Sequence, residues 1–202
     1  MPSMPRSKAA WGLVLAAALA CPVAAQEMRP DDRMRLDQLD VAMGRALRQV
    51  LSSASNEELV VAINALRGPA MPAVPAASAT LAGDWRCSMV KIGGNLPLVA
   101  YPPFRCRIEA GEGVLRFEKL TGSQRTSGTL HAQDGRWIYL GSTFVQGQAP
   151  RRYEDFPAEI DMSASETLPD VGVLEVTGEG QARLILPLPY REAVLNVLVL
   201  TR

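Results

Sequence analysis

From residue 80 to the end of the chain, apolar residues recur at about every second position, and short turn sequences interrupt them at intervals. A period of two is typical of β-strands, because successive side chains point to opposite faces of a sheet. Turn-forming residues stand at 93–95, 111–113, 122–123, 134–135 and 178–180. Asp134-Gly135, between two alternating stretches, is a strong hairpin signal.

The alternating stretches are the candidate strands, and they cover 85–89, 104–108, 114–120, 126–132, 136–141, 171–177, 182–186 and 193–201. The connections leave no room for the helical crossovers that a parallel sheet requires. We therefore expect a mainly β protein, an antiparallel up-and-down β-barrel or sandwich of about eight strands. This β domain spans residues 80–202.

Residues 26–68 follow a different period and predict an N-terminal helical hairpin. Apolar residues recur there at spacings of three and four, first at Leu36, Leu39, Met43, Leu47 and Val50, then at Leu59, Ala62, Ile63 and Leu66. Ser55 and Glu58 form a capping-box pattern between the two stripes. Residues 69–79 contain three prolines and no charge, which indicates a semi-rigid Pro/Ala linker.

Residues 1–25 have the order of a secretory signal peptide: Arg6 and Lys8, an apolar run over 9–20, and small residues ahead of Gln26. We expect cleavage near Ala25 and a periplasmic or secreted protein. Lipidation at Cys21 is the alternative, but the large aliphatic residue usual three positions upstream is missing. The apolar run is too short to span a bilayer, and we expect no transmembrane segment in the mature chain.

Charge removes one class of partner. Cleavage would remove Arg6 and Lys8 and no acid, so the mature chain carries a net charge of about −2. Nucleic acids require clustered Lys and Arg side chains. We therefore expect no nucleic-acid partner.

Two cysteines remain after cleavage, Cys87 and Cys106. An even pair in an oxidising compartment favours a disulfide. Both also fall on the apolar face of their strands, Cys87 in phase with Trp85 and Met89, Cys106 in phase with Phe104 and Ile108. We expect these residues, with Leu115 and Phe117, to share one core.

The turn over residues 119–125 is the most suggestive polar segment. It places cations, hydroxyls and an amide around a glycine, and its candidate binding residues are Lys119, Thr121, Ser123, Gln124 and Arg125. Such a turn could bind an anionic or sugar-like group. The alternative is a polar hairpin whose side chains bond to its own backbone.

We assign no catalytic residue, metal site or cofactor. The single histidine, His131, has no neighbouring nucleophile or carboxylate in the sequence, and we expect its loss to leave function intact. Four acids, Glu154, Asp155, Glu159 and Asp161, lie in a charge-mixed stretch typical of a solvated surface. A hydrolase that combines these acids with the 119–125 turn is the alternative function.

Several motifs together resemble an exported bacterial family catalogued as domain of unknown function 4893. They are Gly83-Asp84-Trp85-Arg86-Cys87, Tyr101-Pro102, residues 104–108, residues 119–125, Tyr139-Leu140-Gly141 and Leu186-Pro187. The resemblance implies export, helices before a β domain with paired cysteines, and no assigned activity. Gly83-Asp84-Trp85 is also similar, more faintly, to the opening of lipocalin-like barrels and of secreted protease-inhibitor barrels.

These observations predict a non-enzymatic binding or protein-interaction module. We expect its partner to be a small apolar or amphipathic ligand, or a protein of the cell envelope.

Overall fold

The computed structural model describes residues 27–73, 78–111, 114–163 and 165–202. The expected signal peptide and Cys21 lie outside these residues. The helices are α1 (Pro30–Asp37), α2 (Leu39–Ser53), α3 (Asn56–Leu66), α4 (Ser78–Leu81) and the 3₁₀ helix η2 (Tyr153–Asp155). The strands are β1 (Gly83–Ile92), β2 (Leu98–Ala100), β3 (Phe104–Ala110), β4 (Leu115–Lys119), β5 (Gln124–Gln133), β6 (Arg136–Val145), β7 (Leu168–Gly178), β8 (Gln181–Pro187) and β9 (Leu195–Thr201).

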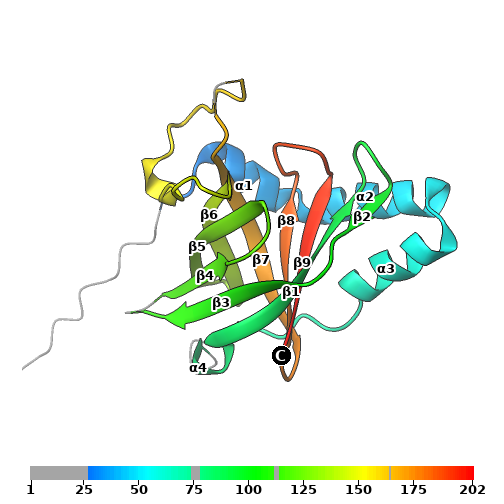
Figure 1. Ribbon diagram of the computed structural model, residues 1–202, viewed down its shortest axis with the longest axis horizontal. Coiled ribbons are helices and arrows are strands. Elements are labelled where there is room, and N and C mark those ends of the chain that lie inside the picture. Colours follow the sequence, from blue (N-terminus) through cyan, green and yellow to red (C-terminus); the bar gives the residue numbers. More distant parts are fainter. Residues whose placement is uncertain (1–26, 74–77, 112–113, 164) are drawn as a thin grey trace, which may run out of the picture.

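Eight of these strands form a closed antiparallel barrel in the order β1-β3-β4-β5-β6-β7-β8-β9, and β9 pairs back onto β1 (Figure 1). The expected antiparallel fold is confirmed, as a barrel. The extra strand β2 pairs with the last part of β1, which turns away from β3 after Cys87. Its three residues lie between a turn and two prolines, too short a stretch to show alternation.

The protein has two apolar cores, one on each side of the barrel wall. Inward side chains fill the barrel interior, and outward side chains of β1, β7, β8 and β9 pack against α1–α3, while those of β6 join the same outer core next to η2. This is why β8 is buried at six successive positions. In Figure 1 the three helices lie along one side of the barrel. The outward side chains of β3 and β4 are exposed instead.

The N-terminal part consists of three helices, because the first expected helix is interrupted at Gln38, between α1 and α2. The capping box at Ser55 and Glu58 is present, with both reciprocal hydrogen bonds. The buried face of α3 consists of Ala62 and Ala65, whereas Ile63 is 48% exposed. Small residues allow α3 to approach the neighbouring elements closely.

The expected linker is attached to the barrel. The amide of Met71 donates to Val176 O at 2.9 Å, and that of Ala73 donates to Gly135 O at 2.8 Å. Helix α4 then begins within the predicted linker and covers one end of the barrel. Its Leu81 is buried in the interior core and accepts a hydrogen bond from Trp85 Nε1 at 2.9 Å. The barrel is therefore closed at the α4 end.

The disulfide between Cys87 and Cys106 is confirmed, with a Cα–Cα distance of 5.9 Å. The two residues are diagonal neighbours on β1 and β3, since Trp85 lies opposite Cys106 and Cys87 lies opposite Phe104. Both cysteines are completely buried in the barrel interior. The predicted core is present as well: Trp85, Ile108, Leu115 and Phe117 belong to it, and Met89 and Phe104 pack against it.

Replacing both Cys87 and Cys106 by alanine should lower the free energy of unfolding by about 3 kcal/mol, because the bridge restricts the unfolded chain. Denaturant unfolding of the variant and of the oxidised protein measures the difference. Oxidised wild-type protein should also show no free thiol after denaturation. A loss below about 1 kcal/mol would contradict the expectation that the bridge contributes to stability.

Candidate functional site

Along the barrel interior, the inward side chains change from apolar to polar. The α4 end and the middle are filled by apolar groups such as Trp85, Phe117, Leu130 and Leu198. Near the end that holds the β8–β9 connection (Figure 1), polar side chains from several strands face a common space. These polar residues are Lys91, Lys119, Gln124, Thr126, Thr143, Asp170 and Asn196.

The polar end encloses a cavity of about 290 Å³, which we call the mouth cavity. Its apolar wall consists of Met89, Tyr101, Phe104 and Leu186. The volume lies at the low end of the ~300–1,000 Å³ typical of small-molecule sites. The mouth therefore suits a small ligand held at the end of the barrel rather than a long one passing through it.

Tyr139 blocks the barrel below the mouth. Its ring is completely buried, it meets Phe117 edge-on at 5.9 Å between ring centroids, and its hydroxyl lies 2.7 Å from Thr126 Oγ1. The missing side chains of Gly128 and Gly141 make room for it, because a Cβ at Gly141 would lie 2.3 Å from the Tyr139 hydroxyl. Burial raises the pKa of Tyr139 well above its usual value, so the phenol is neutral.

Lys119 points into the barrel from the end of β4, but its amine is engaged by the turn that follows. Nζ donates to Thr121 O at 2.9 Å and to Gln124 O at 2.5 Å, and it lies 3.7 Å from the centroid of the Phe104 ring. Burial, together with the positive charges of Arg125 and Lys91, lowers the pKa of Lys119 to about 8. The main contact of Lys119 is thus with its own turn.

The rest of the predicted binding turn is also largely bonded locally. Thr121 Oγ1 accepts from the amide of Arg105 at 2.9 Å, and Arg125 Nε donates to Gly122 O at 3.2 Å. Of the five candidate residues, Lys119, Ser123, Gln124 and Arg125 line the mouth cavity, and Thr121 does not. The turn forms part of the rim, and the local hydrogen bonding left open by the sequence analysis is present.

Groups that are better placed to meet a ligand come from residues that the sequence analysis did not single out. Lys91 on β1 is 8% exposed, and its ammonium donates to Gln124 Oε1 at 2.9 Å and to the carboxylate of Glu192. On β9, Asn196 Oδ1 is buried and has no hydrogen-bond partner within the described part of the chain. A buried polar atom without a partner is costly, so this acceptor is suited to a donor brought by a ligand.

These residues were in phase with known inward positions. Lys91 follows Cys87 and Met89 at the strand period, and Asn196 precedes Leu198 and Leu200 in the same way. The alternation of inward and outward positions along each strand could have indicated that both side chains point inward. This alternation is informative only when the length of β1 and the closure of the barrel are known. The sequence around Asp170 shows no such alternation, because this residue stands between Pro169 and a continuous apolar run.

A known protein family described as domain of unknown function (DUF4893) matches residues 25–200. The chain belongs to this family. The family match covers both the helices and the barrel, and it confirms the resemblance drawn from the motifs. No curated protein and no solved structure matches the chain.

Two features are absent from the described residues of this DUF4893 protein. None of the described helices combines the length and the apolar character needed to cross a membrane. No cluster of three or more His, Cys, Asp or Glu residues suited to a metal ion occurs within the same part of the chain.

Asp170 borders the mouth cavity on the side of α1 and is buried. Its carboxylate lies 3.6 Å from Arg35 Nη2. Burial raises the pKa of Asp170 to about 6; the positive charge of Arg35 opposes the rise and the negative charge of Asp32 adds to it. The usual pKa of an aspartate is 3.8, so between these two values the folded protein holds a proton that the unfolded chain has lost.

Asp170→Asn should therefore remove a pH dependence of stability. For wild type, the contribution of Asp170 is most favourable below pH ~4, declines between pH ~4 and ~6, and is constant above, by linkage. Between pH 4 and pH 7, the free energy of unfolding of the variant should rise by about 2 to 3 kcal/mol relative to that of wild type. Denaturant unfolding at both pH values measures this gain. An identical pH dependence in the two proteins would contradict the burial assigned to Asp170.

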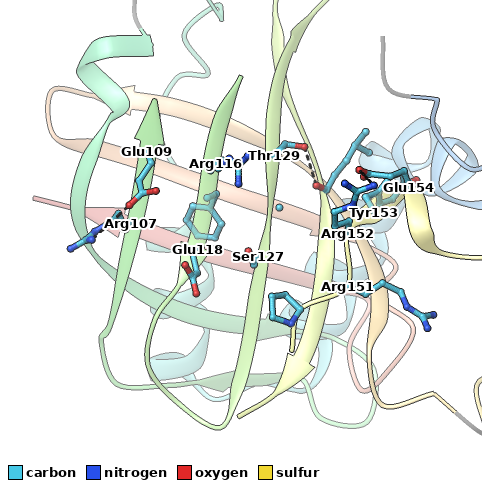
Figure 2. Close-up of a pocket in the computed structure, with 14 residues that line it drawn as sticks. Arg107, Glu109, Arg116, Glu118, Ser127, Thr129, Arg151, Arg152, Tyr153 and Glu154 are labelled. Atoms are coloured by element: carbon cyan, nitrogen blue, oxygen red, sulfur yellow. Dashed lines mark hydrogen bonds and ion pairs between the residues drawn. The ribbon is translucent and has the colours of Figure 1, made fainter. Parts of the chain in front are cut away.

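A second hollow lies on the outer face of β3, β4 and β5, and we call it the outer groove. It has a volume of about 380 Å³, and Figure 2 shows charged side chains of both signs along it, next to residues 150–154. Arg107 pairs with Asp84 at 2.7 Å, and Arg152 pairs with Glu154 at 3.1 Å. Because these charges compensate one another, the groove offers less to a ligand than the mouth cavity does.

The two sets of residues that the hydrolase alternative combines lie at different sites. Glu154 lines the groove, whereas four residues of the 119–125 turn line the mouth, namely Lys119, Ser123, Gln124 and Arg125. Among the described residues that line the mouth, none of the four acids at 154–161 is present.

His131 lies on the outer face of β5, where Nε2 is 2.7 Å from Thr129 Oγ1, and burial lowers its pKa.

Proposed function

We propose that this DUF4893 protein is a non-enzymatic binding module that holds a small amphipathic molecule in the mouth cavity. The observation that carries the proposal is the combination, in one cavity, of the buried ammonium of Lys91, an apolar wall and the buried Oδ1 of Asn196, which has no hydrogen-bond partner among the described residues. Small-molecule sites typically combine a mostly apolar lining with a few polar groups that orient the ligand.

Two titratable groups at the mouth, Lys119 and Asp170, are held by the protein's own contacts, which supports binding rather than catalysis. Lys119 donates to two backbone carbonyls, and Asp170 lies against Arg35. A general acid or base must have its reacting atom within reach of the substrate. These two side chains are instead occupied by the protein itself.

We further propose that the protein acts outside the cytoplasm. The order of residues 1–25 supports export, and the disulfide between Cys87 and Cys106 suits an oxidising compartment. A ligand of this module is then a molecule of the periplasm or of the external medium.

Isothermal titration calorimetry with octanoate and with 1-octanol tests the binding function. Each probe has ten or fewer non-hydrogen atoms, and at roughly 0.6 kcal/mol per atom the tighter of the two should bind with a Kd of tens of micromolar. Asn196→Phe fills the mouth and should abolish binding. Ser127→Phe places the same bulk in the outer groove and should leave binding unchanged.

Thermal melting of both variants verifies that they remain folded. Failure of both probes to bind wild-type protein would contradict the proposed function. Equal binding by wild type and folded Asn196→Phe would do the same, since the ligand would then sit elsewhere.

A further inference from the structure

The ion pair between Lys91 and Glu192 is asymmetric. The Lys91 side chain is 10% exposed, whereas that of Glu192 is 47% exposed. Both residues line the mouth cavity and also a smaller cavity of about 80 Å³ beside it. The carboxylate of Glu192 therefore lies between the mouth cavity and the smaller cavity, and it pairs with the almost fully buried ammonium of Lys91.

Glu192 also has an unusual backbone conformation, with a φ of +72°. Residues other than glycine seldom adopt this conformation and are held in it by their surroundings. Here the carbonyl of Glu192 accepts from the amide of Asn95 at 3.1 Å, and the Leu188 amide donates to Val194 O at 2.9 Å. The backbone of the β8–β9 connection is thus held in place, while the side chain of Glu192 has open solvent on one side.

A buried ammonium requires a negative partner. If Glu192 turned outward, the mouth would keep three cations, Lys91, Lys119 and Arg125, against the single carboxylate of Asp170 that lines the same cavity. Asp170 in turn faces Arg35. The site would then attract an anion and disfavour a cation.

We propose that the carboxylate of Glu192 occupies the position of a ligand's own carboxylate, so that the mouth selects small monocarboxylates with an apolar tail. This inference rests on the proposed function. The ligand headgroup binds Lys91 beside Gln124 and the Tyr101 ring, which lies 5.4 Å from Nζ. The tail lies along Met89, Phe104 and Leu186. Glu192 swings into solvent when the ligand enters.

The discriminating experiment compares octanoate with 1-octanol, which share a tail and differ in the headgroup. By calorimetry, octanoate should bind wild type roughly tenfold more tightly, because bonds to a charged group are stronger than neutral ones. Glu192→Gln removes the internal anion and should raise the affinity for octanoate about five- to tenfold. Its affinity for 1-octanol should not change.

Two further variants complete the test. Lys91→Met keeps the length of the side chain and should lower the octanoate affinity to that of 1-octanol, with folding verified by melting. Glu179→Gln makes the same change as Glu192→Gln on the exposed β7–β8 turn and should have no effect.

If wild type bound the two probes equally and Asn196→Phe abolished the binding of both, this inference would be overturned and the proposed function would stand. An unchanged or reduced octanoate affinity in Glu192→Gln would also overturn it, whether or not Lys91→Met folds. Binding of neither probe would overturn both.

Discussion

Replacing Phe117 by alanine should lower the free energy of unfolding by about 3 to 5 kcal/mol. The ring is completely buried inside the barrel and packs edge-on against Tyr139. A closed barrel cannot collapse around the lost ring without breaking strand hydrogen bonds, so most of the cavity should persist. Denaturant unfolding measures the loss.

Leu51→Ala is the matched control, because Leu51 is 68% exposed on α2. Its effect should be within ~0.5 kcal/mol, as for most surface changes. A loss below about 1 kcal/mol for Phe117→Ala would contradict the inward orientation of β4.

Replacing Asp32 by asparagine should also cost about 3 to 5 kcal/mol, because it leaves the buried guanidinium of Arg29 without its carboxylate partner and Arg35 with Asp170 alone. The Asp32 carboxylate is completely buried. It accepts from Arg29 Nη1 at 3.0 Å, from Arg35 Nη1 at 2.9 Å and from the Tyr153 hydroxyl at 2.6 Å. This cluster fixes α1 to η2 and thereby holds Arg35 against Asp170 at the mouth.

Asp37→Asn makes the same chemical change at an exposed position of α1 and should leave stability almost unchanged. Denaturant unfolding of both variants gives the comparison. Losses of similar size in the two would mean that Asp32 does not hold the helix to the barrel.

Local sequence was sufficient to predict the eight barrel strands and the turns between them, but not β2, because the period of two and the glycine turns depend on neighbouring residues and β2 is too short to show a period. Barrel closure depends on the pairing of β1 with β9, where Val90 lies opposite Val197. A sandwich would show the same alternation in both strands. The choice between the two architectures is therefore set by contacts between residues far apart in the chain.

The candidate site divides in the same way. The 119–125 turn could be found from its composition, since its polar residues are adjacent. Lys91, Asp170 and Asn196 lie on three different strands that are far apart in the sequence, and only the closed barrel brings them together. Asp32 is a similar case: it lies in the first turn of α1, but its partner Tyr153 is 121 residues away in the sequence.

The central claim is that the mouth cavity is the binding site, and an amide NMR titration of nitrogen-labelled protein with octanoate tests it most directly. The account predicts saturable shifts for amides around the mouth, among them those of Lys91, Gln124 and Asn196, with little change at Arg116 and Ser127 in the outer groove. Saturable shifts confined to the outer groove, or no saturable shift at all, would contradict it.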